Sequence, residues 1–589
     1  MVKKSNAVVL IVTMILLGVY VLRLLPYRNE LYVLHDEFAY WAMAAKYGGY
    51  SWKGMMVDSS YYAMGYSLLL VPLFWSGWDT ATMYKCAIVL NAIFIVGAYL
   101  ISFYLGKKLF EHYDKAKLAI VCGIIFLYPA VTMHVNYAWA EVFIMFLFWA
   151  ETFFVCKFAE TKALKWGGFA SILSIIMIYV HQRTIGIMIA WILVFMLCTY
   201  YDKDKLSIKS VGKIICWLLV GVLVWIIFAK LKQYNLENVF VQNDAISAND
   251  FSGQASKVKN LFNLTGMINL IYSVIGKLYY FCVSTLLIGP FAIILLLKEI
   301  INKILHSKQM EWEGFVKIFL VLSFFAMVGI TAIFFSYNYS AEELRIRIDK
   351  LFYGRYFECT VGPLLLVGLC SLRKMKKEYK LSMYVLLIYL IIAIITEKLA
   401  GKIISIGKVD LSAAGFNKFY WLTNNYPNAI LHGAIVIGLV FTVILILNNV
   451  KSLERYSYWI SLLLIAMVWI RETNDNDKII KNREVENKTY VYSVVDYLKE
   501  NEYSEDLVYV YSKEDNNGFS RYAFYMQFNL YEKEFKKIER EELEKEGLNN
   551  DTIYIVMQDS SLMDIFKNEC EHLYSNARIN LFRLEDNFQ

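Results

Sequence analysis

The chain has 589 residues, of which 58% are hydrophobic and only 19% charged, and its mean hydropathy is +0.44. A soluble protein of this length would carry about a quarter charged residues, so the composition excludes an ordinary cytosolic, disordered or coiled-coil protein and indicates one that crosses a membrane many times. The net charge is −10 in residues 471–589 and +17 in residues 1–470, which predicts a basic membrane domain followed by an acidic domain and does not indicate a nucleic-acid partner.

Apolar runs of about 20 residues, the length of a helix that crosses a bilayer, recur throughout the first 470 residues. We predict about thirteen transmembrane helices. The first is an uncleaved span rather than a signal peptide, because its apolar run is too long and no small-residue cleavage site follows it. The predicted spans are 7–25, 80–105, 117–133, 139–156, 166–181, 185–200, 212–230, 282–298, 315–335, 357–372, 381–397, 429–448 and 456–470.

Short loops rich in lysine and arginine, which remain in the cytoplasm, recur on alternate sides of these spans. Together with Lys3 and Lys4 they place the N-terminus inside and, for an odd number of spans, residues 471–589 outside the membrane. The long loops then fall on the outer face, and long loops in compact domains are usually functional. These outer loops cover residues 26–79, 231–281, 336–356 and 398–428.

The first outer loop holds two amphipathic stretches, Phe38–Tyr47 and Tyr61–Trp75, which we predict to be helices lying along the membrane interface. Residues 471–589 alternate between helical and strand-like segments, which predicts a small extracytoplasmic α/β domain. Its predicted helices are Tyr490–Lys499, Phe519–Leu530 and Leu562–Tyr574, and its predicted strands are Asp506–Tyr511, Asp551–Met557 and Ile579–Leu584.

The sequence His35-Asp36-Glu37-Phe38-Ala39-Tyr40-Trp41 follows the first span, at the start of the first interfacial helix. Neighbouring carboxylates beside an apolar bilayer are costly unless they bind or react with something. Carboxylates also stabilise the N-terminus of a helix electrostatically, which explains the pair without any catalytic role. Asp36 and Glu37 are therefore candidate catalytic residues, and the structural explanation stays open.

This arrangement resembles the GT-C superfamily of membrane glycosyltransferases, which includes the protein O-mannosyltransferases and the lipid A aminoarabinose transferases. Members begin with a span and continue with an outer loop that opens on an acidic pair and carries two interfacial helices. The second helix often begins with Pro-Pro, which is missing here and leaves the subfamily open. The outer α/β domain is also similar to the aminoarabinose-transferase architecture. The matching segments are Asp36-Glu37, Tyr61–Leu70, Tyr99–Phe110, Leu127-Tyr128-Pro129, Ala138–Val142 and Tyr353–Glu358 followed by Pro363.

The resemblance implies an inverting displacement at C1 that moves a sugar from a polyprenyl-phosphate carrier to an extracytoplasmic acceptor. Asp36 would be the general base that deprotonates the acceptor, with Glu37 and Glu141 as further catalytic residues. The leaving phosphate needs cations, and a guanidinium fork matches its oxygens, so Arg355 is the preferred phosphate ligand. The other candidates for the donor phosphate are Lys53, Arg345, Arg347 and Tyr356.

Several of these residues have a structural interpretation as well. The basic segment Arg345–Lys350 could bind anionic lipid headgroups, and Glu141 could be a solvated residue at a helix start. A divalent metal ion also stays open, because carboxylates such as Asp36 and Glu141, with or without imidazoles, can hold one. The GT-C resemblance does not decide this point, and no cofactor is certain. The histidines predicted near the outer face are His35, His134 and His181.

The sequence therefore predicts a hexosyl- or pentosyltransferase of a bacterial plasma membrane, with a cell-envelope glycan, lipid or protein as acceptor. The alternative is a transporter or flippase of polysaccharide or lipid-linked saccharide. Transporters tend to show repeated halves and paired spans broken by Gly or Pro near the middle of the membrane. Only six prolines occur here, and no second half repeats the first. A membrane-anchored sensor is a third interpretation, for which so many spans would be excessive.

Overall fold

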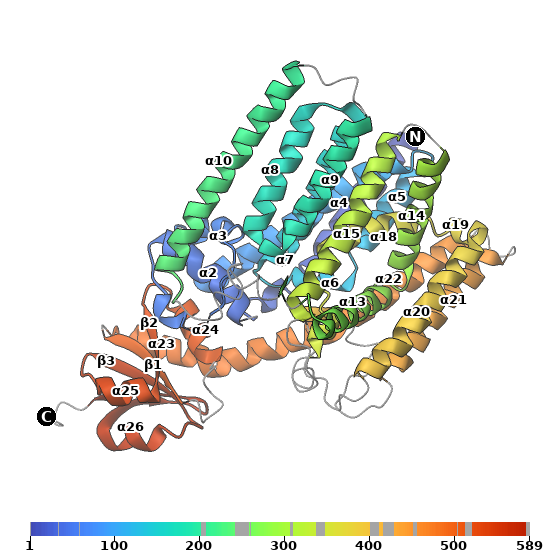
Figure 1. Cartoon of the computed structure of the whole chain (residues 1–589). Coiled ribbons are helices and arrows are strands. Elements are labelled where there is room, and N and C mark those ends of the chain that lie inside the picture. Colours follow the sequence, from blue (N-terminus) through green and yellow to red (C-terminus); the bar gives the residue numbers. More distant parts are fainter. Residues whose placement is uncertain are drawn as a thin grey trace.

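The computed structural model shows a mostly helical chain with a small sheet at its C-terminal end (Figure 1). It describes residues 2–584 except residues 33, 58, 202–207, 242–257, 260, 307–309, 337–347, 401–410, 416–428, 451–455, 504 and 513–520. In this described part, nine helices are long and apolar enough to cross a membrane, and two shorter apolar helices accompany them. The chain is therefore a polytopic membrane protein.

The helices of the membrane region fall into those that are long and apolar enough to cross a membrane and the remainder. Among the described residues, the first group contains α1 (Val2–Val21), α4 (Thr80–Leu109), α7 (Ala140–Thr161), α9 (Ile185–Tyr201, preceded by a 3₁₀ turn), α10 (Ile208–Asn238), α13 (Leu264–Ser284), α15 (Trp312–Ser336), α20 (Tyr379–Ala400) and α21 (Ala429–Asn449). The second group contains α5 (Lys115–Ile125), α6 (Pro129–His134), α8 (Leu164–Val180), α14 (Ile288–His306), α17 (Asp349–Phe352), α18 (Val361–Cys370) and α19 (Lys374–Lys377).

The predicted number of thirteen spans is not confirmed. The predicted span 117–133 is interrupted, because α5 ends at Ile125 and Pro129 begins the separate helix α6; proline lacks the N–H that would continue a helix. The predicted span 282–298 joins the end of α13 to the start of α14. The rest of α13 lies in a segment that the sequence assigned to the outer loop 231–281.

The first outer loop contains one complete predicted helix and part of another. α2 (Leu34–Gly48) includes the predicted Phe38–Tyr47, whereas α3 (Ser67–Phe74) covers only the second half of Tyr61–Trp75. The first half is not helical, and the N–H of Gly65 donates instead to a backbone carbonyl at the end of α8, at 2.7 Å. Both helices lie at the end of the upright helices that faces the sheet (Figure 1).

The C-terminal sheet has five strands in the order β2-β1-β3-β5-β4, with β1 parallel to β2 and β3, and β5 antiparallel to β3 and β4. Two of these strands, β2 and β4, were not predicted. The predicted helix Leu562–Tyr574 is wrong in its last third, where the chain pairs with β5 instead. The strands are β1 (Asp506–Tyr511), β2 (Phe535–Glu539), β3 (Thr552–Met557), β4 (Cys570–Ser575) and β5 (Ile579–Leu584), and the helices are α23 (Ser493–Glu500), α24 (Arg521–Asn529), α25 (Arg540–Glu546) and α26 (Met563–Glu569).

One long helix, α22 (Ser457–Asn487), joins the membrane region to the sheet. Its first half is apolar and its second half polar, and it runs through the predicted domain boundary at residue 470. A π-helical turn (Lys488–Tyr492) then leads directly into α23. The C-terminal sheet domain is therefore attached by a continuous helix rather than by a flexible linker.

α7 lies in the middle of the helical region, where it contacts α4, α8 and α15. The short 3₁₀ helix η5 (Glu358–Thr360) also contacts α7. These neighbours bury the first turn of α7, which begins at Ala140 and includes Glu141. Chain segments that are far apart in the sequence therefore meet at the N-terminal end of this helix.

Candidate active site

Four charged side chains from four separate segments form a chain of ion pairs at the N-terminal end of α7. Asp36 and Glu141 stand in the first turns of α2 and α7. Arg355 precedes η5, and Arg183 belongs to the 3₁₀ helix η3 (Gln182–Thr184). Arg355 contacts Asp36 through Nη1 and donates from Nε to Oε1 of Glu141 at 2.5 Å. The second oxygen of Glu141 accepts from Arg183.

This ion-pair cluster is mostly buried, but one of its carboxylates is partly exposed. The side chain of Asp36 is 14% exposed, whereas that of Glu141 is 1% exposed. Burial alone would lower the pKa of the Arg355 guanidinium, but the two carboxylates raise its pKa well above the usual value, so it stays charged. Tyr62 donates its hydroxyl to Oδ1 of Asp36 at 2.5 Å, and burial together with that carboxylate raises the pKa of Tyr62. Asp36 is thus the more accessible of the two carboxylates in the cluster.

The backbone around Arg355 is fixed by close contacts. A Cβ at position 354 would lie 1.9 Å from the ring of Tyr280, so only glycine fits there. The N–H groups of Gly354 and Arg355 donate to the carbonyl of Ser412 at 2.8 and 3.1 Å. The guanidinium itself lies 4.0 Å from the ring centroid of Trp139, a cation–π contact. These contacts hold the guanidinium in place before any ligand binds.

A cavity of about 200 Å³ opens beside the cluster, with Arg183, Tyr62 and Tyr356 in its wall. Arg183 is 5% exposed, and its Nε and Nη1 groups have no hydrogen-bond partner among the described residues. Buried guanidinium donors are costly when unsatisfied and bind oxyanions strongly, so they indicate a site for an anion. Sequence reasoning missed Arg183, although a single arginine between two apolar runs was a usable signal. The apolar part of the wall includes Ile185, Ile330, Ile333 and Phe334.

Glu37, the neighbour of Asp36, has a different environment. It is fully buried and accepts hydrogen bonds from the hydroxyl of Tyr84 at 2.5 Å and from the N–H groups of Tyr32 and Ala138 at 2.7 and 2.6 Å. Arg28 in turn donates to the hydroxyl of Tyr84 at 2.5 Å. This second cluster, which we call the Glu37 cluster, ties the first outer loop to α4 and to the turn before α7.

No family model matches the sequence, and no curated protein matches it. The structure is similar to two crystal structures of ArnT, an aminoarabinose transferase, from Cupriavidus metallidurans. With the structure bound to undecaprenyl phosphate, the TM-score is 0.57 at 10% identity over 98% of both chains. With the apo structure, it is 0.52 at 11% identity over 99% of this chain and 98% of that chain. The chain has a GT-C fold.

The other residues proposed to bind phosphate lie in different places on this GT-C fold. Tyr356 borders the cavity. Lys53 donates its ammonium group to the carbonyl of Glu237 at 2.8 Å, at the end of α10. Arg345 and Arg347 lie outside the described residues. Of the described candidates, Tyr356 therefore joins Arg355 at the site, whereas Lys53 binds the end of a helix.

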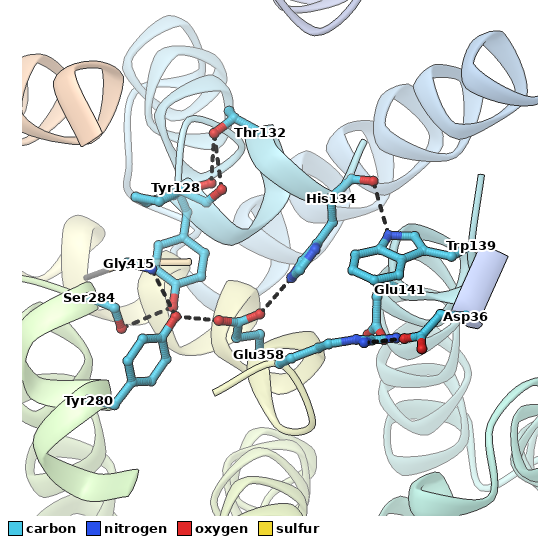
Figure 2. Close-up of polar contacts among 12 residues, drawn as sticks. Asp36, Tyr128, Thr132, His134, Trp139, Glu141, Tyr280, Ser284, Glu358 and Gly415 are labelled. Atoms are coloured by element: carbon cyan, nitrogen blue, oxygen red, sulfur yellow. Dashed lines mark hydrogen bonds and ion pairs between the residues drawn. The ribbon is translucent and has the colours of Figure 1, made fainter. Parts of the chain in front are cut away.

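The three histidines that the sequence predicts near the outer face have different partners and form no common site. His134 shares a buried hydrogen bond of 3.0 Å with Glu358, which also accepts from the hydroxyl of Tyr280 (Figure 2). His35 lies edge-on to an aromatic ring of α24, and His181 to the ring of Tyr356. Within the described ranges, no group of three or more His, Cys, Asp or Glu side chains could hold a metal ion.

The carboxylates alone do not fit a metal ion either. Asp36 and Glu141 are bound to opposite sides of the same guanidinium, that of Arg355. A divalent cation between them would have to displace a group that is buried and already carries the compensating charge. The arrangement therefore suits a negatively charged ligand that accepts from the unpartnered donors of Arg183.

Proposed function

We propose that this protein is an inverting glycosyltransferase that moves a sugar from a polyprenyl-phosphate-linked donor to an acceptor outside the membrane. The observation that carries the proposal is that Arg183, with two donors that have no partner among the described residues, lines one cavity together with Tyr62, whose hydroxyl donates to Asp36. A phosphate site and a carboxylate base thus lie side by side. The fold supports this reading, because one of the two similar structures holds undecaprenyl phosphate.

In this reaction the acceptor attacks C1 of the sugar while the bond between C1 and the phosphate oxygen breaks. Asp36 takes the proton of the acceptor, and the leaving lipid phosphate keeps the electron pair. Arg183 and Arg355 stabilise the negative charge that develops on the phosphate. Glu141 binds both guanidinium groups and thereby fixes their separation, so we assign it a positioning role.

The lipid chain would lie against the apolar part of the cavity wall. Ile330, Ile333 and Phe334 belong to α15, a helix long and apolar enough to cross the membrane, so a chain bound there continues into the bilayer. The sheet domain and the ion-pair cluster lie at the same end of the upright helices. We therefore place this end outside a bacterial plasma membrane and the N-terminus of the chain in the cytoplasm.

Mass spectrometry of lipid-linked sugars and envelope glycans, from cells with and without the gene, tests the proposal. If the protein is a transferase, removal of the gene should cause the intact lipid-linked sugar to accumulate. One envelope component should then lack its sugar. Unchanged lipid-linked sugar together with polymer trapped inside the cell would indicate a transporter instead. The same data name the sugar and the acceptor.

A second experiment assigns the activity to the site. The purified protein in lipid nanodiscs is given the lipid-linked sugar and acceptor so identified, and release of free polyprenyl phosphate is measured. Wild-type protein should release it and Asp36→Asn should not. Arg540→Gln is the matched control, because this exposed side chain belongs to α25 of the sheet domain, where it pairs with Glu544 at 2.7 Å. Equal release by all three proteins would contradict the proposed site.

A further inference from the structure

The C-terminal sheet domain packs directly on the helix that carries Asp36. Phe38 of α2 lies edge-to-face against Phe524 of α24, with ring centroids 4.7 Å apart. One helical turn later, Trp41 lies edge-to-face against Phe528, at 5.0 Å. All four side chains are at most 3% exposed. Edge-to-face contacts between buried rings are directional, so this interface fixes the rotation of α2 as well as its position.

A second contact joins the loop after α2 to the edge of the sheet. The indole N–H of Trp52 donates to the carbonyl of Tyr531 at 2.9 Å, and Ser51 donates to Glu534 at 3.0 Å. A Cβ at Gly54 would lie 2.4 Å from the carbonyl oxygen of Phe535. Since β2 is an edge strand, and edge strands need a cover, the loop of the membrane domain supplies it.

Two further attachments join the sheet domain to the membrane region. Thr80, the first residue of α4, donates to Asn529 of α24 at 3.0 Å. The continuous helix from α22 into α23 carries the sheet outward from the last span. The domain is thus anchored on the membrane region at points independent of α2, which allows it to act as a rigid support for that helix.

Position matters at Asp36 because a general base works only within hydrogen-bond reach of the proton that it takes. A displacement of about 1 Å at a reacting group can cost about a hundredfold in rate. Asp36 stands two residues before Phe38, so a change in the docking of α2 moves Asp36 relative to Arg355. The phosphate-binding arginines lie on other elements and do not share this dependence.

We infer that Phe524 and Phe528 are positioning residues for Asp36, and that the sheet domain serves transfer by holding α2 rather than by binding the acceptor. This inference rests on the proposed function for its kinetic consequence, because Asp36 must be the base. Its structural part, that α24 restrains α2, stands independently. The two parts can therefore be tested separately on the full-length protein.

The test compares Phe524→Leu and Phe528→Leu with Phe566→Leu. Phe566 is fully buried in the same domain but in a separate core, where its ring contacts Tyr554 and Phe582 at centroid distances of 5.3 and 5.6 Å. All three substitutions remove a buried aromatic ring from the domain, but only the first two remove it from α2. Hydrogen–deuterium exchange across Leu34–Gly48 and the transfer rate are measured on each full-length variant in nanodiscs.

We expect exchange in α2 to accelerate by about tenfold and kcat to fall by about tenfold in Phe524→Leu and Phe528→Leu. The KM for the lipid-linked donor and the KM for the acceptor should each stay within about twofold, and Phe566→Leu should change neither exchange nor kcat. Gly54→Ala, which disturbs only the loop on β2, gives a second disruption if the aromatic variants fail to fold.

Unchanged exchange in α2 would overturn the inference, as would an equal loss of kcat in Phe566→Leu. A raised KM for the acceptor at constant kcat would show instead that the domain binds the acceptor. If exchange responds as expected but wild-type protein transfers no sugar, the support of α2 stands and the proposed function fails.

Discussion

Two neighbouring carboxylates at the start of α2 have opposite environments, although sequence alone cannot separate them. Glu37 is fully buried, and three donors at 2.5 to 2.7 Å already satisfy it. Asp36 is partly exposed and belongs to a cluster in which Arg183 borders a cavity and has two donors with no partner among the described residues. A carboxylate whose donors all come from the protein holds the fold together, whereas a partly exposed carboxylate close to a cavity is available to a ligand.

The largest effect is expected at Asp36. Asp36→Asn keeps the shape of the side chain but removes its basicity, so transfer should fall by roughly 100- to 10,000-fold. Release of polyprenyl phosphate by the purified variant measures this, with the melting temperature as control for folding. Full activity in a folded Asp36→Asn variant would show that Asp36 is not the general base.

Arg183 should be the next most sensitive position. Arg183→Gln removes a charged donor to the phosphate, and hydrogen bonds to charged groups contribute about 1.5–3 kcal/mol, so the KM for the lipid donor should rise by about 10- to 100-fold. Arg183→Lys keeps the charge but loses the fork and should recover part of the affinity. An unchanged KM in both variants would mean that the phosphate binds elsewhere.

Glu37 should affect stability rather than turnover. In Glu37→Gln the amide nitrogen cannot accept from the donors that surround Glu37, which costs about 1–3 kcal/mol of the free energy of unfolding. Thermal unfolding in detergent should therefore begin at lower temperature, while kcat of the folded protein stays unchanged. Loss of turnover without loss of stability would return Glu37 to a catalytic role.

Glu30 provides a pH-dependent contribution at the junction between the first outer loop and α22, where it accepts from Asn487. Burial raises the pKa of Glu30 from 4.5 to about 8. The folded protein therefore binds a proton that the unfolded chain releases between these values, so the free energy of unfolding falls as pH rises through this window. Glu30→Gln should flatten that slope in thermal unfolding measured from about pH 5 to pH 9; an unaltered slope would exclude Glu30 as its source.

The smallest effect is expected at Lys53. Because its ammonium group donates to a carbonyl at the end of α10, Lys53→Ala should lower the free energy of unfolding by no more than about 1 kcal/mol. The KM for the donor should change by less than about twofold. A rise comparable to that of Arg183→Gln would support the sequence-based proposal that Lys53 binds phosphate.

The sequence predicts the membrane fold and part of the site for identifiable reasons. Asp36, Glu141 and Arg355 stand at the outer ends of predicted helices, so their topology already places them on one face. The sequence does not reveal Arg183, because a lone arginine between two apolar runs is equally typical of a turn, and only its ion pair with Glu141 of α7 shows its partner. The edge strands β2 and β4 lack the continuous apolar and β-branched runs of β1 and β3, so their pairing with neighbours decides their structure.

The most direct measurement of the central claim is an electron cryo-microscopy map of the protein in nanodiscs with undecaprenyl phosphate added. We predict phosphate density within about 3 Å of the guanidinium nitrogens of Arg183, in the cavity bordered by Tyr62 and Tyr356, with Asp36 on the adjoining wall. Phosphate bound at another site, with that cavity empty and the ion pairs of Arg355 unchanged, would contradict the claim.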